Sequence, residues 1–202
     1  AGLGVNEQIG AHFQELAELV TGIAVMGEMT PRATDAVSAF GERLSSIIVT
    51  ARFRHLGIDA THVDSRSVIV TDTRHTQAAP IFAETYKRLA ATIPSLAAQY
   101  VVVMGGFIGS TEAGVTSTLG RGGSDYTASI VGAGVGAEEI QIWTDVDGML
   151  TADPRKVPKA FPIPEVTFEE AMELCHFGAK VIYPPTIQPA VDEQIPLVIK
   201  NT

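Results

Sequence analysis

The sequence has little cysteine and no long apolar run, and both absences exclude classes of protein. Cys175 is the only cysteine in 202 residues, so a framework of intrachain disulfides is excluded. No run of about 18 uncharged apolar residues occurs, and no basic segment leads into an apolar one at the start. Nothing in the sequence therefore argues for membrane insertion or secretion, and we expect a cytoplasmic protein with no membrane partner.

Positive charge is also scarce. The chain has 14 Lys and Arg against 23 Asp and Glu, a net charge of −9, and shows no basic stripe or RNA-binding aromatic motif. We therefore expect no nucleic-acid partner. With 46% apolar residues and no internal repeat or low-complexity linker, the chain can bury the core of one domain or most of a larger one. An acidic protein that binds an anion must concentrate its few cations, which directs attention to Arg121, Arg155 and Lys180.

Helical and strand-like patterns alternate along the chain. Apolar residues at helical spacing predict helices over residues 6–25, 31–57, 81–93, 126–133 and 168–177. Short apolar or β-branched runs predict strands over residues 58–63, 68–70, 100–104, 139–144 and 196–200. This alternation predicts an α/β sandwich with a mostly parallel sheet, in which ligands lie beyond the carboxyl ends of the strands. Glycine turns near residues 105 and 120 and an acidic turn near 145 lie close to such ends.

The most informative motif is Thr118-Leu-Gly-Arg-Gly-Gly-Ser-Asp-Tyr-Thr127, which reads as a glycine turn that opens a helix. Its glycines permit unusual backbone conformations, and we expect Ser124 or Asp125 to cap the helix. Free N–H groups and the positive end of the helix dipole would then converge beside Arg121, which suits an anionic substrate. A surface turn with a solvated arginine explains the same residues about equally well.

Three further clusters are weaker signals when each is taken alone. Phe40-Gly-Glu42 places a glycine inside a long helix, at a cost of about 1 kcal/mol, which suggests that another part of the chain approaches there. Thr144 and Asp145 follow a strand, with Arg155 about ten residues later, and Lys180 follows a helix and a glycine. Each cluster also has an ordinary explanation. Glu42 would be a solvated glutamate, the aspartates would form turns, and Lys180 would lie at a helix terminus.

Taken together and in this order, the motifs resemble the aspartokinase branch of the amino-acid kinase family over essentially the whole length. The matching segments are 40–42, 105–110, 118–127, 143–148, 153–155 and 177–180. The ending from Tyr183 onward is most similar to the kinase portion of bifunctional aspartokinase/homoserine dehydrogenases. The resemblance implies a three-layer α/β/α sandwich, with residues 1–202 forming part of a single catalytic domain and no regulatory domain.

The resemblance also implies ATP-dependent phosphorylation of the β-carboxylate of L-aspartate, with Mg²⁺, to give 4-phospho-L-aspartate for lysine, threonine and methionine biosynthesis. Arg121 would pair with a substrate carboxylate, which its bidentate guanidinium suits. Glu42 and Asp125 would hold the amino group and neighbouring catalytic groups. The other residues implied at the substrate are Ser124 and Phe107, which line the pocket, and Gly105 and Gly106, whose N–H groups support the phosphoryl group.

The same resemblance implies a nucleotide site and an oligomer. Thr144, Asp145, Leu150, Arg155 and Lys180 would contact ATP, with the two cations near the phosphates. Leu150 departs from the pattern, since many relatives carry tyrosine there. A homo-oligomer is also expected.

Two segments that the family pattern includes do not occur in the sequence. These are an initial strand with a Lys-Phe-Gly-Gly loop and a regulatory ACT region. We therefore expect the chain to be an internal piece of a longer protein, to show little kinase activity alone and to expose apolar surface. Two alternatives remain: another kinase of the family, acting on glutamate, N-acetylglutamate, carbamate or a nucleoside monophosphate, and a non-catalytic binding module of the same fold.

Overall fold

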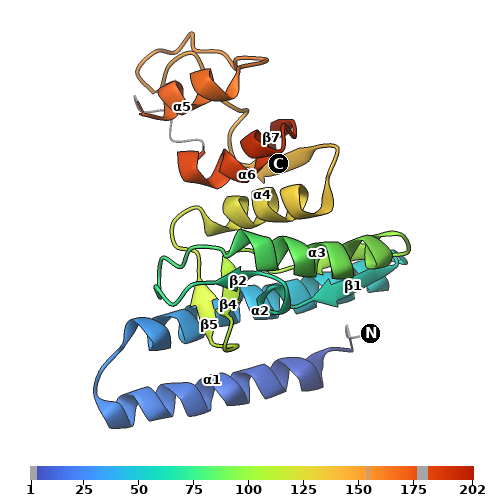
Figure 1. Cartoon of the computed structure of the whole chain (residues 1–202), viewed down its shortest axis with the longest axis vertical. Helices are drawn as coiled ribbons and strands as arrows, with labels where there is room; N and C mark the ends of the chain where they lie inside the picture. Colours follow the sequence, from blue (N-terminus) through green and yellow to red (C-terminus); the bar gives the residue numbers. More distant parts are fainter. Residues whose placement is uncertain (1–3, 154, 177–181) are drawn as a thin grey trace. The chain divides into compact units, whose positions relative to one another are not determined.

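A computed structural model describes residues 4–153, 155–176 and 182–202 (Figure 1). The chain divides into two compact units, residues 1–124 and residues 125–202. Among the described residues, no helix is long and apolar enough to cross a membrane.

Two long helices begin the first unit. Helix α1 (Asn6–Met26) packs along α2 (Pro31–His55). Helix α2 begins as its sequence predicts, because Thr30 accepts a hydrogen bond from the Ala33 N–H and Pro31 occupies the first helical position. The buried face of α2 includes Phe40 and Ile47. This helix supplies one wall of the candidate site.

The strands of the first unit pair mostly in parallel. Strand β1 (Ala60–Val63) pairs in parallel with β3 (Val101–Met104), and β2 (Val70–Thr71) with β4 (Ile108–Thr111). The 3₁₀ helix η1 (Ser65–Ser67) follows β1, and α3 (Phe82–Ala97) connects β2 to β3. Strand β5 (Thr116–Thr118) is antiparallel to β4. Helix α2 packs on β1, β3 and β5, and α3 packs on β2 and β3, so helices cover these strands.

The second unit contains another parallel pair. Strand β6 (Ile140–Thr144) pairs with β7 (Leu197–Asn201), in a register that sets Thr144 beside Asn201. The helices are α4 (Gly123–Val135, which begins two residues before the unit), α5 (Phe168–His176), η2 (Pro184–Ile187) and α6 (Gln188–Asp192). Ile140 and Ile142 form a buried cluster with Ala190 and Ile195.

Most of the predicted elements are confirmed, with ends shifted by a few residues. Thr167 and Glu170 start α5 with a reciprocal capping box, whose N–H···O distances are 2.8 and 3.2 Å. The sequence pattern does not predict the β4–β5 hairpin or α6. The hairpin strands are short and rich in Ser and Thr, and α6 has five residues, so neither produces a clear apolar period.

Candidate active site

The carboxyl end of β3 lies against α2 at Glu42. A Cβ atom added to Gly105 would lie 3.0 Å from the Glu42 carbonyl oxygen and 3.2 Å from its Cβ, so the close approach favours glycine. The expectation that the chain approaches Gly41 is wrong, because Gly41 is exposed and a Cβ there would meet no atom within 4 Å. Successive helical residues point about 100° apart, so Glu42, rather than Gly41, faces the strand.

The peptide that joins Gly105 to Gly106 is fixed in orientation. The hydroxyl of Ser65, a fully buried side chain, donates to the Gly105 carbonyl oxygen at 2.5 Å. Since the peptide is planar and trans, the Gly106 N–H points the opposite way, and it has no hydrogen-bond acceptor among the described residues. This N–H could therefore donate to an anion, which stays a prediction for this loop. Ser65 was not predicted from the sequence, although the residue lies just past a predicted strand.

The segment after β3 interlocks with the start of α4. Phe107 has φ +68°, which is unusual for an aromatic residue. Its N–H donates to the Gly123 carbonyl at 3.3 Å, and its own carbonyl accepts from the Leu119 N–H at 2.9 Å. A Cβ on Gly106 would lie 2.9 Å from the Ser124 Cα. The first unit thus brings Glu42, Gly105, Gly106, Phe107 and Ser124 together.

The glycine turn has the predicted form but a different helix start. Gly120 and Gly122 have φ values of +75° and +69°, and the exposed Arg121 lies between them. Helix α4 begins at Gly123, so Ser124 and Asp125 lie inside its first turn and the prediction that one of them caps it is wrong. Gly123 has no positive φ and is already helical, so the helix begins before the two residues that were expected to cap it. Burial raises the pKa of the Asp125 carboxyl.

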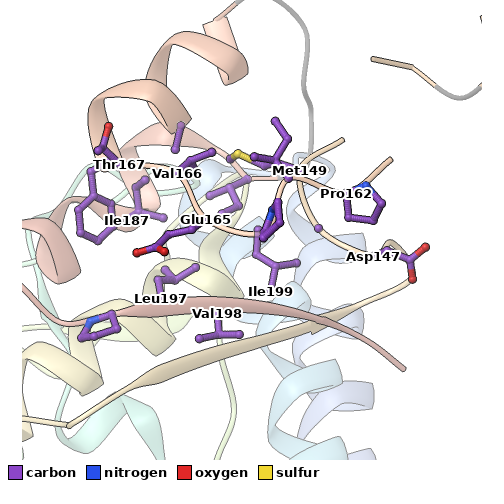
Figure 2. Close-up of a pocket in the computed structure, with 17 residues that line it drawn as sticks. Asp147, Met149, Pro162, Glu165, Val166, Thr167, Ile187, Leu197, Val198 and Ile199 are labelled. Carbon is purple, nitrogen blue, oxygen red and sulfur yellow. The ribbon is translucent and has the colours of Figure 1, made fainter. Parts of the chain in front are cut away.

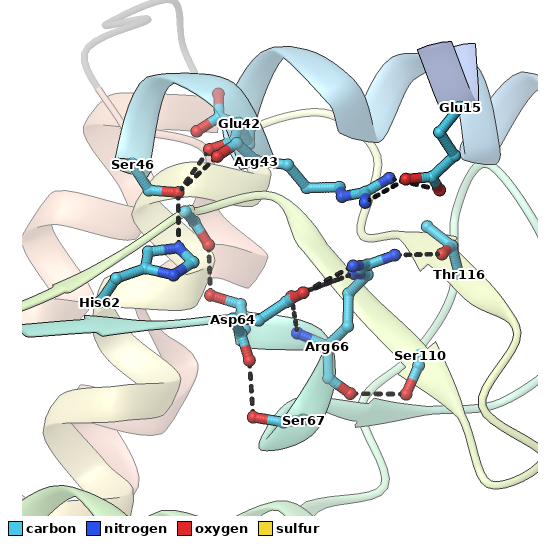
Figure 3. Close-up of polar contacts among 12 residues, drawn as sticks. Glu15, Glu42, Arg43, Ser46, His62, Asp64, Arg66, Ser67, Ser110 and Thr116 are labelled. Carbon is cyan, nitrogen blue, oxygen red and sulfur yellow. Dashed lines mark hydrogen bonds and ion pairs between the residues drawn. The ribbon is translucent and has the colours of Figure 1, made fainter. Parts of the chain in front are cut away.

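Polar contacts behind Glu42 hold α2 in place (Figure 3). The Ser46 hydroxyl donates to the Glu42 carbonyl at 2.7 Å and lies 3.0 Å from Nε2 of His62 on β1. The guanidinium of Arg43, the residue after Glu42, makes a bidentate pair with Glu15 of α1, at 2.9 and 2.7 Å. Burial lowers the pKa of His62, so its ring is neutral near pH 7. These contacts fix the turn of α2 that carries Glu42.

In the second unit, the predicted nucleotide residues follow the carboxyl end of β6. Thr144 and Asp145 lie there, and the Thr144 carbonyl accepts from the Thr202 N–H at 3.0 Å. The carboxylate of Asp147 accepts a hydrogen bond from the Asn201 side chain at 2.7 Å. This contact was not predicted, because only the register of β7 reveals it. Carboxyl ends of parallel strands are the usual place for a ligand.

The other predicted nucleotide residues are more scattered. Leu150 is half-buried and makes an antiparallel bridge with Pro162. The Arg155 side chain is 89% exposed and pairs with Asp153, with its Nε 3.1 Å from Oδ1. An exposed pair of this kind is weak, so Arg155 can exchange its partner for a phosphate. Lys180 and the segment 177–181 lie outside the described residues.

A cavity of about 500 Å³ lies between β7 and the segments around residues 148 and 165 (Figure 2). Its lining is mainly apolar, including Met149, Leu197 and Ile199, with Asp147 at one edge (Figure 2). Among its described lining residues the charged side chains are Asp147 and Glu165, and none of the predicted nucleotide residues is included. The part of the lining that the structure describes therefore offers a triphosphate two carboxylates and no cation, and it suits the apolar part of a ligand better.

Comparisons with known proteins identify the family. A model of the amino acid kinase family matches residues 4–201. Aspartokinase 1, chloroplastic, of Arabidopsis thaliana is 39% identical over 95% of this chain and 34% of its own length. The bifunctional aspartokinase/homoserine dehydrogenase of Haemophilus influenzae is 38% identical over 98% of this chain and 24% of its own.

A solved structure is similar as well. The crystal structure of E. coli aspartokinase III in complex with aspartate and ADP superimposes with a TM-score of 0.89 at 37% identity, covering 98% of this chain and 44% of that one. The chain thus spans less than half the length of these relatives. The similarity confirms the predicted α/β sandwich, and the chain belongs to the amino acid kinase family.

Proposed function

We propose that the chain contributes to the ATP-dependent phosphorylation of the β-carboxylate of L-aspartate, which gives 4-phospho-L-aspartate, and that it shows little of this activity alone. In this proposal, residues 1–202 are part of one catalytic domain that serves the biosynthesis of lysine, threonine and methionine. The similarity to aspartokinases, including one whose crystal structure holds aspartate and ADP, supports the choice of substrate.

The observation that carries the proposal is the convergence of complementary groups at the end of β3. An amino acid with two carboxylates needs an acceptor for its ammonium group and donors for its anions. Glu42 offers the acceptor, and the Gly106 N–H and the hydroxyl of Ser124 offer donors, with all three on neighbouring backbone. Arg121 lies in the turn that leads to Ser124 and offers a bidentate partner for the α-carboxylate.

The chemistry needs positioning more than proton transfer. The aspartate carboxylate is already ionised near pH 7, so it attacks the γ-phosphorus without a general base. Negative charge on the transferred group spreads over its equatorial oxygens, where a fixed N–H such as that of Gly106 stabilises it. Asp125, in the first turn of α4, is proposed from the sequence motif as a further partner of the substrate ammonium group.

ATP would be bound by residues of the second unit. Thr144 and Asp145 would contact the nucleotide, Leu150 would lie beside it, and Arg155 would leave Asp153 for a phosphate. Lys180 is proposed as a second phosphate partner from the sequence motif alone. Arginine suits this exchange because a phosphate offers it the same bidentate geometry as a carboxylate.

The donor set fits Mg²⁺ that arrives with the nucleotide. Within the described ranges, no cluster of three or more His, Cys, Asp or Glu side chains could hold a metal ion. Mg²⁺ commonly binds through one or two carboxylates, waters and substrate phosphates, and the exposed Asp145 could supply such a carboxylate. When bound, Mg²⁺ neutralises charge on the β- and γ-phosphates.

Other parts of the proposal concern the setting of the protein. A cytoplasmic location is supported by the acidic composition with a single cysteine. Assembly into a homo-oligomer is supported by apolar side chains on α1 that remain exposed, Phe13 at 56% and Val20 at 49%. We propose no nucleic-acid or membrane partner.

Release of ADP, measured with the protein expressed from its complete gene, tests the proposal. MgATP would be offered with L-aspartate, L-glutamate, N-acetyl-L-glutamate, carbamate or UMP. We expect turnover with L-aspartate, and an increase in its KM of about 100-fold or more in Arg121→Ala with little change in the KM for ATP. Arg52→Ala, which removes an exposed arginine from the last turn of α2, serves as the matched control. Turnover with a different acceptor would replace the proposed substrate, and nucleotide binding without turnover would favour a binding module.

A further inference from the structure

Asp35 is a fully buried carboxylate on α2 that the proposed reaction does not use. Its side chain is 0% exposed. The Thr76 N–H lies 3.0 Å from both of its oxygens, Oγ1 of Thr118 donates to Oδ1 at 2.5 Å, and Nδ1 of His75 lies 2.7 Å from Oδ2. A buried charge is tolerated only when it is paired and hydrogen-bonded, so these contacts are required for Asp35 to remain in the core.

The partners of Asp35 support the glycine turn that carries Arg121. Thr118 ends β5 and is followed directly by residues 119–123. A Cβ added to Gly120 would lie 3.0 Å from the Thr76 carbonyl oxygen, and the Ala78 N–H donates to the Thr118 carbonyl at 2.9 Å. Residues 76–78 therefore form a support beneath the turn, and Asp35 ties this support and the start of the turn to α2.

Helix α2 also carries Glu42, seven residues after Asp35. Seven residues are almost two full helical turns, so the two carboxylates lie on the same face of α2, about 10 Å apart along its axis. One rigid helix thus sets the position of Glu42 and, through Asp35, that of the turn with Arg121. These are the groups assigned to the ammonium and carboxylate ends of the substrate.

We propose that Asp35 is a positioning residue, which fixes the turn 119–123 so that Arg121 stands at the correct distance from Glu42 to bind the amino-acid substrate. The identity of that substrate rests on the proposed function. The hydrogen bond from Thr118 is the connection that can be removed with the least change of shape, since valine and threonine are nearly isosteric.

The kinetic test compares Thr118→Val with Thr118→Ser, which keeps the hydroxyl. The control is Thr111→Val, which removes another buried hydroxyl, one that accepts from the Val115 N–H at the far end of the same hairpin. In the protein expressed from its complete gene, we expect Thr118→Val to raise the KM for L-aspartate about tenfold, with the KM for ATP within about twofold. Thr118→Ser should restore the wild-type KM.

Hydrogen exchange supplies a test that does not depend on the reaction. The Leu119 N–H donates to the Phe107 carbonyl and the Gly123 N–H to the Gly120 carbonyl, so both amides should be protected. We expect Thr118→Val, but neither Thr118→Ser nor Thr111→Val, to speed exchange at these amides about tenfold, without a comparable rise across the rest of α2. Asp35→Asn, which removes the charge and keeps an acceptor, should also speed exchange at these amides. It replaces Thr118→Val in the test if that variant does not fold.

The outcomes separate the two proposals. If the wild type does not phosphorylate aspartate, the proposed function fails and the exchange experiment still decides the role of Asp35. Unchanged exchange in Thr118→Val, or equal changes in Thr111→Val, would overturn the positioning role. An equal rise in the KM values for aspartate and ATP in an active enzyme would overturn it as well.

Discussion

Replacing Gly106 with alanine should damage the site by moving the start of α4. The added Cβ would lie 2.9 Å from the Ser124 Cα, 3.1 Å from its Cβ and 3.2 Å from its Oγ. Carbon atoms in ordinary contact lie about 3.5–4.0 Å apart, so Ser124 and its neighbours must move by about 0.6 Å or more. The atom in the way belongs to the backbone, so a change of side-chain rotamer cannot relieve the contact.

The size of the effect follows from this displacement. Overpacking of this kind costs about 1–3 kcal/mol of stability. A shift of about 1 Å in a group that positions a substrate can cost about 100-fold in rate, so a shift of about 0.6 Å should lower kcat/KM for L-aspartate about tenfold or more. The KM for ATP should change less, because the displaced residues contact the acceptor in the proposed mechanism.

Gly41→Ala is the matched control. Gly41 is an exposed glycine of the same site motif, and an added Cβ there would meet nothing within 4 Å. Alanine at this helical position should stabilise the protein by about 0.5–1 kcal/mol and leave activity unchanged. Urea unfolding and steady-state kinetics on both variants provide the measurements. If kcat/KM of Gly106→Ala stayed within about twofold of wild type, the close packing of Gly106 against Ser124 would not matter for function and the reasoning would be refuted.

Three further predictions concern charge. Because burial lowers the folded-state pKa of His62 below 6.5, the unfolded chain binds more protons at mildly acid pH, so stability should fall as pH drops through this range. In urea unfolding, His62→Gln should therefore weaken the dependence of the free energy of unfolding on pH in this range. An unchanged dependence would contradict this prediction. Burial raises the pKa of Asp125, so its charge opposes folding near pH 7. Asp125→Asn should unfold at a higher urea concentration yet lose activity, and a less stable variant would contradict this. Glu15→Gln should lower the free energy of unfolding by about 1–3 kcal/mol in the same assay, because the Arg43 side chain is 9% exposed and loses its charged partner. Equal stability of variant and wild type would show that solvent replaces the ion pair.

The sequence predicts the elements whose pattern is long and regular. Helix α2 is identified by apolar residues at helical spacing, and β3 by an unbroken apolar run. The β4–β5 hairpin was missed because its hydroxyl side chains find partners inside the fold, as Ser117 does with Thr71 of β2 at 2.7 Å. A polar residue buried by a partner far along the chain cannot be told from an exposed one by pattern alone.

The candidate site likewise contains residues that the sequence reveals and residues that it does not. The motifs around Glu42, Gly105 and Arg121 were found because glycines and charged residues stand out in the sequence. Ser65 and Asp35 were not found, since their roles depend on contacts 40 or more residues away in the chain. A close approach of the chain was expected at Gly41, whereas in the structure the close approach is between Glu42 and Gly105.

Trapping the reaction product tests the central claim most directly. The protein expressed from its complete gene would be incubated with MgATP, L-aspartate and hydroxylamine, and the hydroxamate identified by mass spectrometry. An acyl phosphate on the side-chain carboxylate reacts to give the β-hydroxamate of aspartate, in an amount that matches the ADP released. We predict that product in the wild type and its loss in Arg121→Ala. ADP release without aspartate hydroxamate, or a hydroxamate that forms only with another acceptor, would contradict the account.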